Sequence, residues 1–142
     1  MKAEAYPVGC VIMASGLSLR FGSNKLLAPF GGAPLLCRAL AATEGLFAAR
    51  VVVTRSAGVR ALCEENGVPV LLHTLPGRND TVRLGLDALP ALSGCVFLPG
   101  DQPLLTRGTL AAMAAAFCAA PERERAIFRL CDPESGTPGS PV

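Results

Sequence analysis

A glycine-rich, basic stretch directly follows the first apolar run of the chain, residues 8–13. Glycines allow the backbone to approach an anion closely, small hydroxyl side chains add hydrogen-bond donors, and guanidinium and ammonium groups bind phosphate oxygens. The stretch therefore predicts a phosphate-binding loop after a strand. The residues that carry this prediction are Ser15, Gly16, Ser18, Arg20, Gly22 and Lys25.

The spacing of this loop excludes two common phosphate-binding motifs. Lys25 lies three residues beyond Gly22 instead of next to it, and no GK[ST] occurs, so the loop is not a Walker A motif. The G-x-G-x-x-G pattern of dinucleotide-binding folds is also absent from Gly16 onward. Val53 is followed by Thr54-Arg55 and not by the acidic residue that would bind a ribose.

Asp101 is the second candidate for chemistry. It follows the apolar run 95–98 within Pro99-Gly100-Asp101-Gln102-Pro103. A single carboxylate in a turn is commonly a turn former or a helix cap. If it lies opposite the basic loop, it is also a natural ligand for Mg²⁺, which binds one or two carboxylates together with phosphate oxygens.

A third polar cluster lies at residues 79–83. Asn79 or Asp80 could simply cap a helix, with Arg83 in solvent. The functional alternative is that Asn79 and Thr81 contact the base or sugar of a nucleotide, because a helix N-terminus at this place would face the strand ends. His73, the only histidine, is either a residue of the site or one that lies at the edge of the cleft.

Composition limits the class of partner. The chain has 142 residues, 51% of them hydrophobic, a mean hydropathy of +0.44 and a net charge of +2. Such a balanced charge predicts neither a nucleic-acid nor a membrane surface, so small molecules are the expected partners. Six scattered cysteines without a CxxC pair indicate buried thiols in a reducing compartment. We expect a cytoplasmic protein.

Apolar runs alternate with helical patterns along the chain. This alternation predicts an α/β fold with three layers, in which helices cover both faces of a mainly parallel sheet, and residues 1–142 as a single domain. Ligands of such sheets bind beyond the C-terminal ends of the strands. The predicted strands are 8–13, 49–54, 69–72, 95–98 and 126–130. The predicted helices are 34–45, 56–66, 79–89 and 106–120, opened by Pro34, Ser56, Asn79 or Asp80, and Thr106, with Val82, Leu86 and Leu89 of the third facing inward.

Three ordered motifs resemble those of a known family. Residues 14–27 resemble the LAAGxSxRMGxxKLL signature of the MobA-like nucleotidyltransferases, and specifically of the molybdenum-cofactor cytidylyltransferases. Residues 98–103 resemble the family's GDQP element, and residues 78–86 its middle motif, in which a small hydroxyl residue precedes a Gly-Leu pair. Ser15 in place of Ala and Phe21 in place of Met are mild departures.

The resemblance implies a Rossmann-like sheet of the nucleotide-diphospho-sugar transferase (GT-A-like) type and an Mg²⁺-dependent nucleotidyltransferase. The implied reaction transfers CMP from CTP to the phosphate of molybdopterin and releases pyrophosphate. CTP is favoured over GTP because Ala14-Ser15-Gly16 resembles the AAG of the cytidine-using branch more than the AGG of the guanosine-using one. The implied catalytic residues are Arg20, Lys25 and Asp101, with Asp101 as metal ligand. The implied nucleotide-binding residues are Ala14, Ser15, Gly16, Ser18, Arg20, Lys25, Asn79 and Thr81.

Residues 136–142 resemble a late G-x-x-G-x-P segment, after which family members continue. The resemblance therefore implies that the chain lacks a C-terminal part, and a sheet that has lost edge strands is expected to pair with a second copy or to aggregate. A molybdoenzyme or its insertion chaperone is a further implied partner. Two alternatives stay open: a nucleotidyltransferase for another acceptor, such as a sugar phosphate or methylerythritol phosphate, and a nucleotide-binding protein without turnover.

Overall fold

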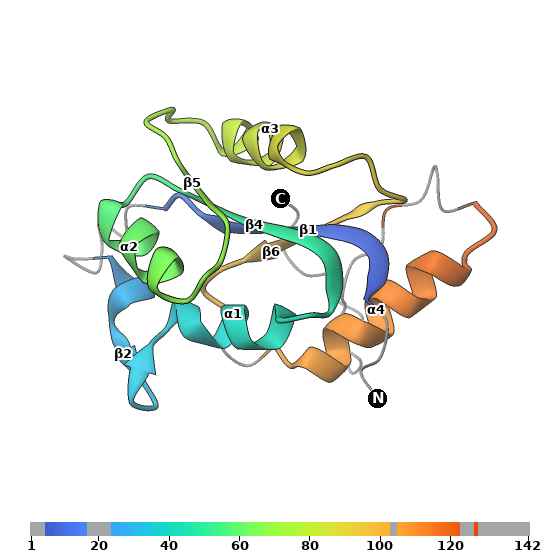
Figure 1. Cartoon of the computed structure of the whole chain (residues 1–142), viewed down its shortest axis with the longest axis horizontal. Helices are drawn as coiled ribbons and strands as arrows, with labels where there is room; N and C mark the ends of the chain where they lie inside the picture. The colour runs from blue at the N-terminus through green and yellow to red at the C-terminus, as the bar shows by residue number, and fades with distance from the viewer. Residues whose placement is uncertain (1–4, 17–23, 103–104, 123–126, 128–142) are drawn as a thin grey trace, which may run out of the picture.

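A computed structural model describes residues 5–16, 24–102, 105–122 and 127 of the chain (Figure 1). Its main sheet, within these residues, consists of four parallel strands in the order β5-β4-β1-β6. Ile12, at the centre of the sheet, pairs with Val52 on one side and with Leu98 on the other. The strands are β1 (Tyr6–Ala14), β4 (Phe47–Thr54), β5 (Val70–Leu72) and β6 (Cys95–Pro99).

Helices cover both faces of this sheet. In Figure 1, α3 lies on one side of the strands, and α1, α2 and α4 lie on the other. The arrangement confirms the predicted parallel α/β fold. The helices are α1 (Leu36–Thr43), α2 (Ala57–Glu65), α3 (Arg78–Ala88) and α4 (Arg107–Ala119).

The core is divided between the two faces by the alternation of side chains along each strand. Val8, Cys10 and Ile12 of β1 pack in the larger cluster with residues of α1, α2 and α4, whereas Val11 belongs to the smaller cluster beneath α3. Because both sets are buried, the strand reads as a continuous apolar run instead of an alternating one. The apolar runs therefore predicted β1, β4, β5 and β6 at nearly their observed positions.

Two predicted helix caps are confirmed. The Ser56 hydroxyl accepts a hydrogen bond from the backbone N–H of Val59, and α2 begins at Ala57, directly after Ser56. The Thr106 hydroxyl accepts one from the N–H of Thr109 at the start of α4. In each case the hydroxyl satisfies a backbone donor that has no partner within the helix.

The prediction that Pro34 opens the first helix is wrong. Pro34 belongs to a small antiparallel hairpin made of β2 (Pro29–Phe30) and β3 (Ala33–Pro34), and α1 begins at Leu36. Gly31 and Gly32 form the turn of the hairpin with φ of 63° and 90°. This left-handed backbone is accessible to glycine at little cost, so the glycine pair favours a hairpin over an early helix start.

The start of α3 also differs from the prediction. Neither Asn79 nor Asp80 is the capping residue, because the helix begins at Arg78 and its N-cap is Gly77. Asp80 lies in the first turn, where its carboxylate accepts a hydrogen bond of 3.0 Å from the Gly77 N–H. A negative charge at this position is favoured by the positive end of the helix dipole.

The inward face of α3 was predicted only in part, because Leu89 packs on the smaller core cluster as expected but Leu86 does not. Leu86 is 46% exposed, whereas Thr81 and Gly85 are buried and Leu84 packs on the smaller core cluster. A Cβ added to Gly85 would lie 2.5 Å from Cγ1 of Val11, so α3 approaches β1 more closely there than any side chain would allow. Glycine therefore sets the buried face of α3.

The predicted strand 126–130 lies almost entirely outside the described residues and stays a prediction. Within the described ranges, no helix is both long and apolar enough to cross a bilayer.

Candidate functional site

The candidate site lies where the sheet reverses its winding direction. From β1 the chain continues to β4 and β5 on one side, and it then returns to place β6 on the other side of β1. The loops after β1 and β6 therefore leave neighbouring strands at the same edge. In parallel α/β sheets such a switch point, at the C-terminal ends of the strands, is where ligands bind.

Gly100 holds the two loops together at this edge. Its backbone N–H donates a 2.9 Å hydrogen bond to the carbonyl of Met13, at the end of β1. A Cβ at position 100 would come within 3.0 Å of Leu36 Cδ1 and 3.3 Å of the Met13 oxygen. The tight fit explains the glycine of the PGDQ segment and brings the next residue, Asp101, close to the end of β1.

Lys25 and Asp101 form an ion pair across this edge. The Nζ of Lys25 lies 2.7 Å from Oδ2 of Asp101, and the two side chains are 45% and 37% exposed. Lys25 begins a short 3-10 helix, η1 (Lys25–Leu27), in which the buried Leu26 anchors the turn to the core. The structure thus brings together two predicted catalytic residues that are separated by more than half of the chain.

The Ser15 hydroxyl is the centre of a second, uncharged cluster. It donates to the carbonyl of Val53 at 3.3 Å and accepts from the Thr81 hydroxyl at 2.8 Å. Its Oγ also lies 2.8 Å from Nε2 of His73. A hydroxyl has one donor and two acceptor positions. The Ser15 hydroxyl is therefore fully used inside the protein.

The tautomer of His73 follows from its two contacts. Its Nδ1 accepts a 3.1 Å hydrogen bond from the backbone N–H of Leu75, so Nδ1 carries no proton. In the neutral ring the proton must then be on Nε2, which donates to Ser15. The pKa of His73 is lowered from its ordinary value of 6.5, first by burial and then by the charge of Arg55, while Asp80 opposes the shift. All of these effects except that of Asp80 favour the neutral ring.

Thr81 reaches Ser15 because Gly85 lies one turn further along the same face of α3. Thr81 is 3% exposed, and the close contact of Gly85 with Val11 places this face of the helix directly on β1. Residues four apart on a helix are neighbours on one face. The small hydroxyl residue and the Gly-Leu pair of the middle motif thus have a common structural reason: the glycine permits the approach, and the hydroxyl binds the end of β1.

The other predicted site residues occupy different environments. Ala14 is buried, and its carbonyl accepts a 2.8 Å hydrogen bond from the Thr54 hydroxyl. Gly16 is exposed, and a Cβ there would meet nothing within 4 Å, so the space beside it is open. Asn79 is exposed on the first turn of α3. Ser18 and Arg20 lie outside the described residues, so the structure does not test their proposed roles.

The side chains at this edge fit a metal ion that is coordinated mainly by the phosphate oxygens of a bound nucleotide and by water. Among the described residues, no group of three or more His, Cys, Asp or Glu could form a metal cage. Asp101 offers a carboxylate that is 37% exposed. Mg²⁺ commonly takes one or two carboxylates and completes its coordination with phosphate oxygens and water, which this arrangement allows.

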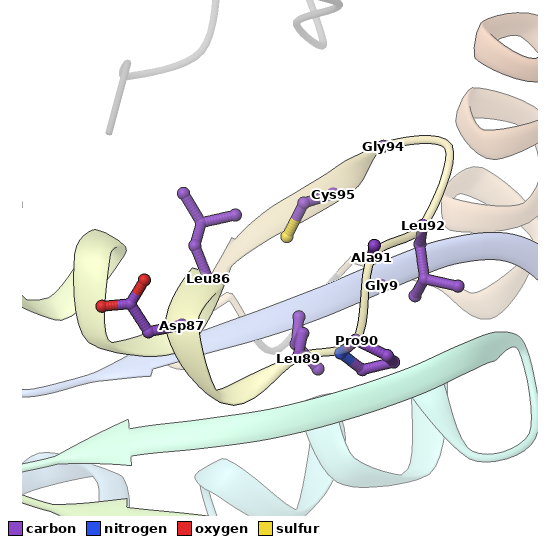
Figure 2. Close-up of a pocket in the computed structure, with 9 residues that line it drawn as sticks. All are labelled: Gly9, Leu86, Asp87, Leu89, Pro90, Ala91, Leu92, Gly94 and Cys95. Atoms are coloured by element: carbon purple, nitrogen blue, oxygen red, sulfur yellow. The ribbon is translucent and has the colours of Figure 1, made fainter.

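A cavity of about 520 Å³ lies away from this edge, beside the N-terminal end of β6 (Figure 2). Figure 2 shows that its lining comes from the end of α3, the following loop, β1 and β6. Asp87 is the only ionisable lining residue besides Cys95, whose thiol has a pKa raised to about 11, mainly by burial. A pocket without cationic groups, at the wrong end of the strands, is not suited to a nucleotide. Its lining residues are Gly9, Leu86, Asp87, Leu89, Pro90, Ala91, Leu92, Gly94 and Cys95.

Comparison with known proteins identifies the family of this chain. A family model described as the MobA-like NTP transferase domain matches residues 10–139. The chain belongs to this family. The match confirms the resemblance at the level of the MobA-like NTP transferase domain, and it includes both loops of the switch point and the whole of α3.

Two relatives extend the comparison. The bifunctional protein GlmU of Kineococcus radiotolerans is 35% identical over 125 residues, which cover 81% of this chain and 26% of that protein. Rv0371c of Mycobacterium tuberculosis is similar in structure, with a TM-score of 0.69 and 26% identity over 77% of this chain and 60% of that one. The chain spans about a quarter of the length of the curated relatives it matches.

The contact of His73 with Ser15 and the close approach at Gly85 are the features of the site that the sequence analysis did not predict. His73 comes directly after β5, and the rule that drew attention to Ser15 and Asp101, their place after a buried strand, applies to it equally. Gly85 left no signal in the hydrophobic pattern, because a residue without a side chain adds nothing to an apolar face. Only its place in the MobA-like middle motif pointed to it.

Proposed function

We propose that the chain carries a nucleotidyltransferase activity, in which CMP is transferred from CTP to the phosphate of a molybdopterin-type acceptor and pyrophosphate is released. The observation that carries this proposal is the Lys25–Asp101 pair beside Ser15 and Gly16, at the switch point of a MobA-like sheet. Cationic and anionic side chains side by side at such an edge suit a triphosphate with its metal ion.

The chemistry requires alignment more than acid or base catalysis. An anionic oxygen of the acceptor phosphate forms a bond to the α-phosphorus, the bond from that phosphorus to the bridging oxygen breaks, and pyrophosphate leaves with the electron pair. No proton has to be removed from the attacking oxygen, so no general base is needed. The rate then depends on positioning the reactants and on stabilising the developing charge.

The described residues can supply these functions. The ammonium group of Lys25 stabilises negative charge on the leaving phosphates, and the backbone N–H groups of Ser15 and Gly16 can donate to phosphate oxygens. Asp101 would hold Mg²⁺, which when bound shields the phosphate charges from one another. When the triphosphate enters, Lys25 exchanges its contact with Asp101 for contacts with the nucleotide.

Cytidine is the proposed base for two reasons. Ala14-Ser15-Gly16 carries a single glycine, and a solved cytidylyltransferase from Leptospira borgpetersenii is 27% identical with a TM-score of 0.65. The matched region covers 82% of this chain and 51% of the Leptospira protein. A CMP-2-keto-3-deoxy-manno-octonic acid synthetase complexed with CTP shares the fold at 15% identity.

The acceptor is the less constrained half of the proposal. Neighbours in fold are named for a keto-sugar acid and for methylerythritol products, so a different phosphate or sugar acceptor is the alternative. The test measures pyrophosphate release with each of the four nucleoside triphosphates, Mg²⁺ or Mn²⁺, and molybdopterin, a sugar phosphate or methylerythritol phosphate. Manganese is included because Rv0371c has been solved as a manganese complex.

Turnover that requires both CTP and molybdopterin is the expected result. Turnover with another acceptor would replace molybdopterin in the proposal and would leave the proposed class of reaction unchanged. Binding of CTP without turnover for any acceptor would favour a nucleotide-binding protein, and the absence of binding to every triphosphate would contradict the proposal.

A further inference from the structure

The cluster around the Ser15 hydroxyl joins segments that are far apart in the chain. Ser15 follows β1, Val53 is the last but one residue of β4, His73 follows β5, and Thr81 lies on α3. His73 is also held by its own backbone N–H, which donates to the Thr54 carbonyl at 3.0 Å. The ring is therefore fixed to the sheet, and through its Nε2 it fixes Ser15.

Both ring nitrogens of His73 are engaged, which limits what the residue can do. Nδ1 accepts from Leu75, and Nε2 donates to Ser15. To act as a general base or a metal ligand, the ring would have to break one of these bonds. A role in orienting its neighbours needs no such change.

We propose that His73 is a positioning residue for the nucleotide: in its neutral form with the proton on Nε2, it holds the Ser15 hydroxyl and thereby orients the backbone N–H groups of Ser15 and Gly16 toward the triphosphate. The inference rests on the proposed function, because it assumes that a triphosphate binds at this edge. It adds a residue that the family motifs of this chain did not point to.

Two conservative substitutions separate the two contacts of the ring. In His73→Gln, the side-chain amide N–H can replace Nε2–H and still donate to Ser15. In His73→Asn, the shorter amide oxygen can replace Nδ1 and still accept from Leu75, but the donor to Ser15 is lost. The variants are thus matched in polarity and differ in the contact that the proposal depends on.

We expect His73→Asn to raise both the KM and the Kd for CTP about three- to tenfold, the effect of one neutral hydrogen bond, with kcat almost unchanged. His73→Gln should restore values close to those of the unaltered chain, and the melting temperatures of the two variants should agree. Equal affinities in all three proteins would contradict the inference. So would a fall in kcat without a change in KM, or a loss of affinity that follows the melting temperature.

The pH profile gives a second measurement. Protonation of Nδ1 would point a new N–H directly at the N–H of Leu75, so that two donors face each other and the ring is displaced from Ser15. Gln has no donor at that place. Nucleotide affinity of the unaltered chain should therefore decrease as the ring becomes charged. Arg55 after β4 and Asp80 on α3 are the charged groups that act on this ring among the described residues. The nucleotide's own titration is common to the unaltered chain and to His73→Gln. A difference between their profiles below pH 6.5 supports the inference, and identical profiles contradict it.

The tautomer can be measured without any nucleotide. His73 is the only histidine of the chain, so a two-bond ¹H–¹⁵N spectrum of the untagged protein reports on this ring alone. A proton on Nε2 is expected, and a proton on Nδ1 would overturn the inference whatever the activity. A chain that binds no triphosphate would contradict the proposed function as well, whereas equal binding by His73→Asn and the unaltered chain would contradict this inference alone.

Discussion

Two polar clusters lie at the same edge of the sheet and differ in almost every physical respect. The Lys25–Asp101 pair is charged and more than a third exposed, whereas the Ser15–His73–Thr81 cluster is uncharged, partly buried and joined by several hydrogen bonds. An exposed ion pair contributes about 0–1 kcal/mol to stability, so the contact between the two side chains can be exchanged at little cost. A buried hydroxyl cannot lose a partner so cheaply. The charged pair is therefore suited to exchanging its contacts when a ligand binds, whereas the uncharged cluster is suited to holding the site in place.

The largest effect is expected when the charged pair is broken. Lys25→Ala or Asp101→Asn should lower kcat/KM about 100-fold or more, the usual effect of removing a group that stabilises transition-state charge. Stability should change by less than about 1 kcal/mol. Pyrophosphate release and thermal unfolding measure the two quantities.

Matched controls for these variants lie elsewhere on the surface. Arg60 forms an exposed pair with Glu64 on α2, and Asp87 is exposed on α3. Arg60→Ala and Asp87→Asn should leave turnover unchanged. A loss of less than tenfold in the Lys25 or Asp101 variants, or an equal loss in the controls, would show that the pair has no part in the reaction.

The next largest effect concerns the support beneath the uncharged cluster. Gly85→Ala would place a Cβ 2.5 Å from Val11, so α3 has to move away from β1. We expect a loss of about 1–3 kcal/mol in the free energy of unfolding, as for overpacked cores, measured by urea denaturation. Nucleotide affinity should fall as well, because Thr81 moves with the helix.

A second helical glycine provides the comparison. At Gly108 in α4, the nearest atom to an added Cβ is Oγ1 of Thr106 at 3.8 Å. Gly108→Ala should therefore be neutral, or stabilising by about 0.5–1 kcal/mol through the lower backbone entropy of alanine. Equal costs at the two positions would mean that the contact of α3 with Val11 is not tight.

A smaller effect is expected when one hydrogen bond of the cluster is removed. Thr81→Val keeps the volume and deletes the hydroxyl that donates to Ser15, at a cost of about 1 kcal/mol. The Kd for CTP should rise a few-fold. Thr43→Val is the control, because Thr43 is also buried but hydrogen-bonds to Ala39 and Arg50 in another part of the core.

Thr43→Val should lower the melting temperature without changing nucleotide affinity. If both threonine variants lower affinity in proportion to their stability, the uncharged cluster supports the whole fold and not the site in particular.

The smallest expected effect is on the pH dependence of stability. The pKa of His73 is lowered from 6.5 in the folded protein, so between the two pKa values the unfolded chain binds more protons than the folded one. The contribution of neutral His73 to stability is complete above pH 6.5, the pKa in the unfolded chain, and it decreases as the pH falls through the pKa of His73 in the folded protein. Urea midpoints of the unaltered chain and His73→Gln, measured from pH 5 to 8, should diverge below pH 6.5. Parallel midpoints, or a divergence of the opposite sign, would contradict the lowered pKa.

Local patterns predicted most of the fold. The four strands are apolar runs that are buried on both faces, and Ser56 and Thr106 cap helices through contacts three residues away. Such contacts depend only on neighbouring residues. The errors arose where a second element decided the outcome: Pro34 was taken up by a glycine-turn hairpin, and Leu86 was turned to solvent by the approach of α3 to β1.

The sequence by itself determined the parallel α/β class and the places of its four strands, and it predicted a phosphate-binding loop after the first strand and a role for Asp101. These depend on residue type and local order. Only the tertiary structure decided that Lys25 lies against Asp101 and that the Ser15 hydroxyl belongs to His73 and Thr81, its partners 58 and 66 positions away. A hydrogen bond depends on the distance and direction between two atoms. For residues far apart in the chain, both are set by the order of the strands and by how closely α3 packs on the sheet.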